Sequence, residues 1–118
     1  MATPTTFTVE NVDAAQLGSS IATLLTVAAN TNGIQITSIK LVNDSTTPVT
    51  ATIHLVPSGG SADVTNILCN AFSVPGDGLP YELITLGNPV FLEPSGLIRG
   101  LAGTADVITY HISYVEFN

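Results

Sequence analysis

Residues 34–56 read IQITSIKLVNDSTTPVTATIHLV, and they contain the clearest pattern in the chain. Between residues 49 and 56 the side chains alternate in type. One set is Val49, Ala51, Ile53 and Leu55, and the other is Thr50, Thr52, His54 and Val56. This period of two predicts a β-strand with one buried face. Residues 44–48 have the composition of a turn, so we expect them to close a hairpin between strands 34–43 and 49–56.

The strand predicted at residues 34–43 changes phase in its middle. Ile34 and Ile36 are followed by Ile39 and Leu41, which breaks the alternation near Thr37. An extra residue at Thr37-Ser38 would return all four side chains to one face, as a β-bulge does. The sequence therefore predicts a bulge there.

The rest of the chain has the rhythm of a β-sandwich or barrel, because turn residues recur about every eight to twelve positions. Further strands are predicted at 6–10, 21–29, 66–72, 81–86, 90–93 and 106–117. Residues 21–29 also fit a short helix, although Thr23, Thr26 and Val27 favour a strand, and 97–101 are a strand or irregular. The last strand is apolar on both faces, so we expect the domain or a partner to cover both.

These elements predict an all-β protein of about eight strands, an antiparallel two-sheet β-sandwich. Jelly-roll and immunoglobulin-like strand orders both remain open. We expect an N-terminal arm at residues 1–6 and a single sandwich domain at 7–118. The length of 118 residues suits one domain.

Charge is scarce. Charged residues make up 9% of the chain, against about 25% in ordinary soluble domains. The net charge is −7, and Lys40 and Arg99 are the only fixed cations. Two isolated cations exclude binding to nucleic acid or to an anionic membrane. A surface so poor in ionic groups predicts burial against other copies or a scaffold, although Thr is also common in β-proteins simply because it suits strands.

Edge strands are expected to lack the usual protection by charge. Lys40 is the only Lys, and it lies in a strand predicted to be central. Pro4, Pro80 and Pro89 offer one form of protection. We favour the alternative, in which another subunit or its arm covers the edges.

No constellation for chemistry is evident. His54 and His111 are the only possible bases, and no nucleophile motif accompanies them. Two His and Cys69 on distant strands make a poor zinc site. We therefore expect no catalysis, no cofactor and no metal. Cys69 lies in an apolar stretch and is expected to be a buried, inert thiol.

No signal peptide or apolar run of about 18 residues is visible. We therefore expect synthesis in a cytoplasm without export.

Three segments carry a resemblance to a known family: Ile39–Ser45, Val49–Ser61 and Tyr110–Glu116. They are similar to small virion structural proteins of tailed bacteriophages, and the similarity extends over about half of the chain. The resemblance lies in a strand, an Asn-x-Ser turn, a Thr-alternating strand, a Val-Pro-Ser-Gly loop and a closing strand. It implies a β-sandwich subunit of the particle, such as a capsid decoration (cement) protein or a tail or fibre component. No binding residue carries over.

The leading hypothesis is a decoration protein that binds the outside of the shell as a homo-oligomer, plausibly a trimer. The expected partners are other copies and the major capsid protein or another virion protein. A tail, fibre or head–tail joining subunit is the alternative, and a module that binds host-surface carbohydrate is an alternative of another class. The predicted contact residues are Thr3, Pro4, Thr5, Thr6 and Phe7 in the arm, Val56, Pro57, Ser58 and Gly59 in a loop that runs on to Ser61, and Val115 and Phe117 at the end of the last strand.

Overall fold

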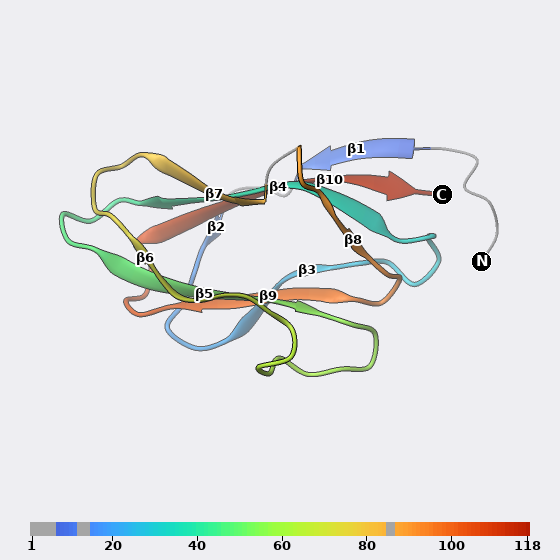
Figure 1. The fold of residues 1–118 in the computed structure, drawn as a ribbon, viewed down its shortest axis with the longest axis horizontal. Helices are drawn as coiled ribbons and strands as arrows, with labels where there is room; N and C mark the ends of the chain where they lie inside the picture. Colours follow the sequence, from blue (N-terminus) through green and yellow to red (C-terminus); the bar gives the residue numbers. More distant parts are fainter. Residues whose placement is uncertain (1–6, 12–14, 85–86) are drawn as a thin grey trace.

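The computed structural model describes the backbone of residues 7–11 and residues 15–84 and 87–118 in full. These residues form two antiparallel sheets that face each other, as Figure 1 shows edge-on. The predicted antiparallel β-sandwich is confirmed. Ten strands occur among the described residues, and none of these residues forms a helix that could cross a membrane.

Sheet A contains six strands, with β10 and β4 at its centre. They are β1 (Phe7–Asn11), β2 (Ala15–Gln16), β10 (Ile108–Phe117), β4 (Ile34–Asn43), β7 (Pro80–Ile84) and β8 (Val90–Leu92). β1 and β2 both pair with β10, and β7 and β8 both pair with β4. Each of these two short pairs therefore occupies one strand position.

Sheet B contains four strands in the order β3, β9, β5, β6. They are β3 (Ala22–Thr26), β9 (Leu97–Ala102), β5 (Val49–Val56) and β6 (Ile67–Val74). With β1/β2 and β7/β8 counted as single positions, the two sheets have the strand order of an eight-stranded jelly roll. The segment at 97–101, for which a strand and an irregular structure were both open, forms strand β9. The strand predicted at 21–29 is β3, which is shorter than expected.

The hairpin predicted between β4 and β5 is wrong. β4 belongs to sheet A and β5 to sheet B, so residues 44–48 cross from one sheet to the other. Five extended residues reach about 16 Å, which is enough to span the gap of about 10 Å between packed sheets. Turn residues and alternation are the same for a hairpin and for such a crossing, so the local sequence could not separate them.

The bulge predicted in β4 is confirmed. Ser38 pairs with Ser113 and Ile36 pairs with Tyr114, which leaves Thr37 as the extra residue. The Thr37 hydroxyl donates a hydrogen bond of 3.1 Å to the Ser113 carbonyl oxygen. As a result, the apolar side chains on both sides of the bulge are buried.

The core lies between the sheets and is built from aliphatic side chains. Its fully buried members include Ile34, Ile36, Ile39, Leu41, Ile53, Ile98, Ile108 and Ile112. Shortening one of these side chains to Ala would cost about 2–5 kcal/mol. β10 is central in sheet A. Its inward side chains lie in the core, but its outward side chains, including His111 and Val115, are only half-buried, so the domain does not fully cover the second face as expected.

Candidate interaction surfaces

The predicted contact regions are only partly placed by the structure. Residues 3–6 of the arm lie outside the described residues. Phe7 begins β1, and its backbone pairs with Phe117 on β10. The arm and the final strand were predicted separately, and the pairing places the start of β1 beside the end of β10.

The loop after β5 is exposed, as predicted, but its first residue is not. Pro57, Ser58 and Gly59 are exposed, and the Gly60 N–H closes a turn by donating to the Pro57 carbonyl oxygen at 3.0 Å. Val56 is fully buried. A side chain without exposed surface cannot contact a partner, so the prediction of Val56 as a contact residue is wrong.

Val56 is buried although it points away from the core between the sheets. Pairing of β5 with β9 is regular from Ala51 to Val56, so His54 and Val56 lie on the outward face of sheet B. The connection between β5 and β6 folds back over this end of the face (Figure 1), and Asn66 at its end holds it there. The Asn66 carbonyl accepts from Leu55 N–H at 2.9 Å, and its side-chain oxygen lies 2.8 Å from His54 Nδ1.

Val115 and Phe117 lie on the outward face of sheet A, where the structure adds a third apolar residue to them. Val115 pairs with Gln35, which pairs in turn with Phe91 on β8. The rings of Phe91 and Phe117 stack with their centroids 6.3 Å apart. Phe91 is 50% exposed and Phe117 is half-buried, so this end of the sheet A face presents mainly the Phe91 ring to solvent.

Gly33 makes this arrangement possible. A Cβ atom on Gly33 would lie 2.5 Å from Cζ of Phe91, so the ring rests directly on the glycine backbone. Phe91 was not predicted to be a contact residue. It lies in a strand of three residues, which is too short to show an alternation of apolar and polar side chains.

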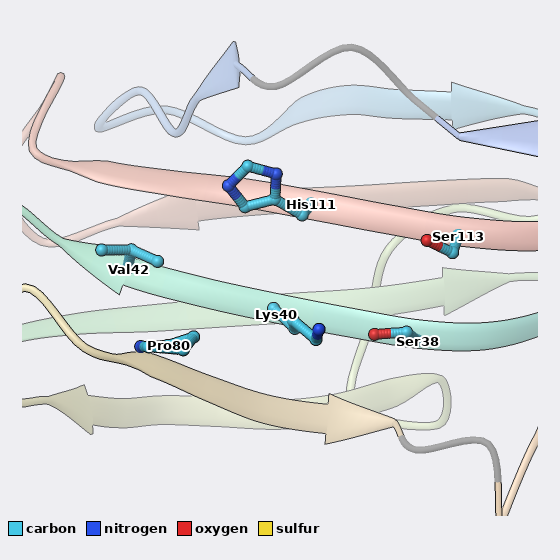
Figure 2. Close-up of a pocket in the computed structure, with 6 residues that line it drawn as sticks. All are labelled: Ser38, Lys40, Val42, Pro80, His111 and Ser113. Atoms are coloured by element: carbon cyan, nitrogen blue, oxygen red, sulfur yellow. The ribbon is translucent and has the colours of Figure 1, made fainter.

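The middle of the same face holds a shallow depression of about 380 Å³. Figure 2 shows its lining, which comes from β4, β7 and β10 and consists of Ser38, Lys40, Val42, Pro80, His111 and Ser113. Lys40 Nζ lies 3.7 Å from a carboxylate oxygen of Glu82 on β7. The charges of this pair compensate each other, so the strands of sheet A leave the depression nearly neutral.

The two histidines do not form a common site. His111 lies in the depression on sheet A, whereas His54 lies on the outward face of sheet B, on the opposite side of the molecule. His54 is buried, and its Nδ1 lies within hydrogen-bond distance of the Asn66 side-chain oxygen, so this histidine has a structural partner. Among the described residues, no three His, Cys, Asp or Glu side chains gather in a way that would hold a metal ion.

Arg99 is the most unusual polar side chain of sheet B. It lies on β9, opposite Thr23 of β3 and His54 of β5. Its Nε atom is buried and has no hydrogen-bond partner among the described residues. A buried polar group left without a partner costs about 1–3 kcal/mol. The sequence offered a weak signal for this residue, since it is the one charge in an otherwise uncharged strand.

Strand β6 forms one edge of sheet B and carries no charged residue. This agrees with the expectation that edges lack protection by charge. A local irregularity is present instead: Ala71 has φ of 50°, and the pairing of β6 with β5 shifts register twice. Cys69 on this strand is half-buried, and burial raises the pKa of its thiol.

No protein-family model and no curated protein matches the chain. Two solved structures show similarity, both of infectious bursal disease virus. The structure of the Gx strain matches with a TM-score of 0.41 and 16% identity over 96% of this chain. The structure of the Gt strain matches with a TM-score of 0.43 and 14% identity over 97% of this chain. This chain spans 32% of the length of each of those chains.

Proposed function

We propose that this protein is a non-catalytic structural subunit of a bacteriophage particle, and specifically a decoration protein that binds the outside of the capsid shell. The observation that carries the proposal is the nearly neutral outward face of sheet A, where the exposed Phe91 ring stacks on half-buried Phe117 at one end. An exposed apolar patch of this kind marks a contact surface. We assign this face to the shell.

Two further features support a place in a virion. The resemblance to phage structural proteins lies in β4, β5 and β10, which form the centre of the sandwich. The strand order is that of a jelly roll, an architecture found in viral capsid proteins and also in lectins. Fold alone does not determine function, so the surface and the resemblance carry the argument together.

The lectin alternative has less support on the surface of the protein. Hydroxyl groups of Ser38 and Ser113 line the depression on sheet A, together with His111. Its lining contains no Phe, Tyr or Trp ring on which a sugar could stack. A tail, fibre or head–tail joining role uses the same kind of surface as decoration and differs from it in copy number.

Binding through this face is passive. A standard protein–protein interface buries about 1,600 Å² in total, and each Å² of apolar area contributes about 25 cal/mol before the costs of association. Many copies on one shell would act together and raise the effective affinity. No proton transfer or covalent step is required.

The test is co-sedimentation of the purified protein with shells of the virus that encodes it, prepared without the protein. We expect saturable binding at a copy number comparable with that of the shell subunit. Phe91→Ser should weaken binding at least about tenfold, because the aromatic pair lies at the contact. Leu79→Ser is the matched control, since Leu79 is 58% exposed but lies in the turn before β7, away from Phe91.

The outcomes separate the alternatives. Circular dichroism must first show that both variants are folded. Absence of wild-type binding to shells would overturn the proposed function, and binding at only a few copies per particle would favour the tail role. Equal binding by Phe91→Ser and the wild type would remove the sheet A face as the contact. Reproducible hits on a glycan array would favour the carbohydrate-binding module.

A further inference from the structure

The strands of sheet B carry a single fixed charge, which is positive. β3, β5, β6 and β9 contain no Asp, Glu or Lys, and Arg99 is their only ionic side chain. In a chain with nine acidic residues and a net charge of −7, this makes the outward face of sheet B the one large surface with a positive centre among the described residues.

Arg99 has no anionic partner within the described part of the protein. Lys40, the other cation, pairs with Glu82 on sheet A. Asp63 lies in the connection that covers one end of the sheet B face, but its carboxylate accepts hydrogen bonds from Thr65, from N–H at 2.8 Å and from the hydroxyl at 2.5 Å. The charge of Arg99 is therefore not compensated locally.

The surroundings of Arg99 strengthen any interaction with an anion. The residue is partly buried, with its Nε atom shielded from water. Leu97 and Leu101 flank it on the same face of β9 and are half-buried. A cation among apolar groups is less screened than one in open solvent, so a partner charge gains more there. A guanidinium group matches the planar geometry of a carboxylate in particular.

We propose that a second copy of this chain places a carboxylate on Arg99, so that the outward face of sheet B is the contact between copies. This inference rests on the proposed role as an assembly subunit and names the partner of its second face. Charge complementarity favours a copy of the chain, because it brings nine acidic residues. In the described part of the chain, only Glu82 among these acids forms an ion pair.

The positions of the acidic residues also indicate the symmetry of the contact. The strands of sheet B bring no carboxylate of their own, and Asp63, at one end of the same face, already accepts two hydrogen bonds from Thr65, so we place the acid on a different surface of the second copy. A contact between two different surfaces generates a ring when its rotation closes. A trimer is one such ring, and it would leave the sheet A face of each copy available for the shell.

The test is sedimentation velocity on the purified protein without shells. We compare the wild type with Arg99→Gln and with Lys40→Gln, which removes the same charge from the opposite face. We expect the wild type to associate and the salt concentration to weaken the association. Arg99→Gln should weaken it at least about tenfold, while Lys40→Gln should match the wild type. Thermal unfolding shows whether each variant is folded.

A charge-reversal series identifies the acid. Chains with Arg99→Glu should not associate with one another. In nine further variants, each of the nine acidic residues is changed to Lys in turn, and each variant is mixed with the Arg99→Glu protein. Restored association by one mixture supports the proposal and locates the carboxylate, whereas failure of all nine overturns it.

A strictly monomeric wild type, or equal association by folded Arg99→Gln, also overturns the proposal. Neither result touches the shell-binding test, so the two proposals fail independently.

Discussion

The side-chain amide of Asn43 donates a hydrogen bond of 2.9 Å to the carbonyl oxygen of Val74, and this bond joins the two sheets. Asn43 ends β4 in sheet A, and Val74 ends β6 in sheet B. The same amide nitrogen donates to the Thr47 carbonyl at 2.8 Å, and the amide oxygen accepts from the N–H and the hydroxyl of Ser45. Asn43 is fully buried, and its side chain holds together the crossing between the sheets.

Replacement of Asn43 should therefore destabilise the fold. Asn43→Ala removes donors from two carbonyl groups, those of Val74 and Thr47, and we expect a loss of about 1–3 kcal/mol. Asn43→Asp should cost more, because a carboxylate oxygen would then face both carbonyls. Urea denaturation measures the effect. Ser45→Ala, at a more exposed hydroxyl, should cost less, and an Asn43→Ala protein as stable as the wild type would contradict the assigned role.

Deletion of Thr37 should be tolerated better than deletion of Gln35. Without Thr37 the strand alternates regularly from Ile34 to Leu41, and the main loss is one hydrogen bond to Ser113, worth about 0.5–1.5 kcal/mol. Without Gln35 the Ile34 side chain would turn to the outward face, with a cost of about 2–5 kcal/mol for its lost burial. Chemical denaturation of both deletions measures the difference. Equal stability of the two would show that the bulge does not set the register.

A Cβ atom at residue 76 should destabilise the fold by crowding the crossing between β4 and β5. In Gly76→Ala the new atom would lie 2.6 Å from the backbone nitrogen of Thr47, which cannot move as a side chain can. We expect a loss of about 1–3 kcal/mol. Gly87→Ala is the control, because a Cβ atom on Gly87 would have no neighbour within 4 Å among the described residues, and its effect should stay within about 0.5 kcal/mol. Thermal unfolding that ranks the two in the opposite order would contradict this packing.

The pKa of Tyr81 should depend on Asp77. The Tyr81 hydroxyl donates a hydrogen bond of 2.6 Å to the Asp77 carboxylate, which raises the pKa of Tyr81 above 10.0 and lowers that of Asp77 below 3.8. In Asp77→Asn we expect the pKa of the Tyr81 phenol to fall towards its ordinary value. Titration of the Tyr81 ring signals by NMR measures this shift, and an unchanged pKa would show that the bond does not persist in solution.

The same bond determines a dependence of stability on pH at both ends of the scale. The pKa of Asp77 is lower in the folded protein than in the unfolded chain. Its contribution to stability is therefore present above the pKa of the unfolded chain and is lost as the pH falls through the pKa of the folded protein. The pKa of Tyr81 is higher in the folded protein than in the unfolded chain. Its contribution to stability is therefore present below the pKa of the unfolded chain and is lost as the pH rises through the pKa of the folded protein. Asp77→Asn should remove both dependences.

The class of fold and several local features were predictable from the amino-acid sequence alone. Alternation identified β5, and the phase change identified the bulge at Thr37-Ser38. These features are readable because each depends on side chains within a few residues of one another, and burial of one face imposes a period of two.

Only the tertiary structure decided which strands are partners and which surfaces are available. Residues 44–48 join two sheets rather than two neighbouring strands, and the connection after β5 buries Val56 on a face that alternation marks as outward. Phe91 meets Phe117, and Arg99 Nε is left without a hydrogen-bond partner in the described part of the chain, through pairings between residues far apart in the sequence. Local periodicity specifies the direction in which a side chain points. Whether that side chain is covered depends on segments far away in the sequence, and the candidate surfaces of this protein depend on this cover.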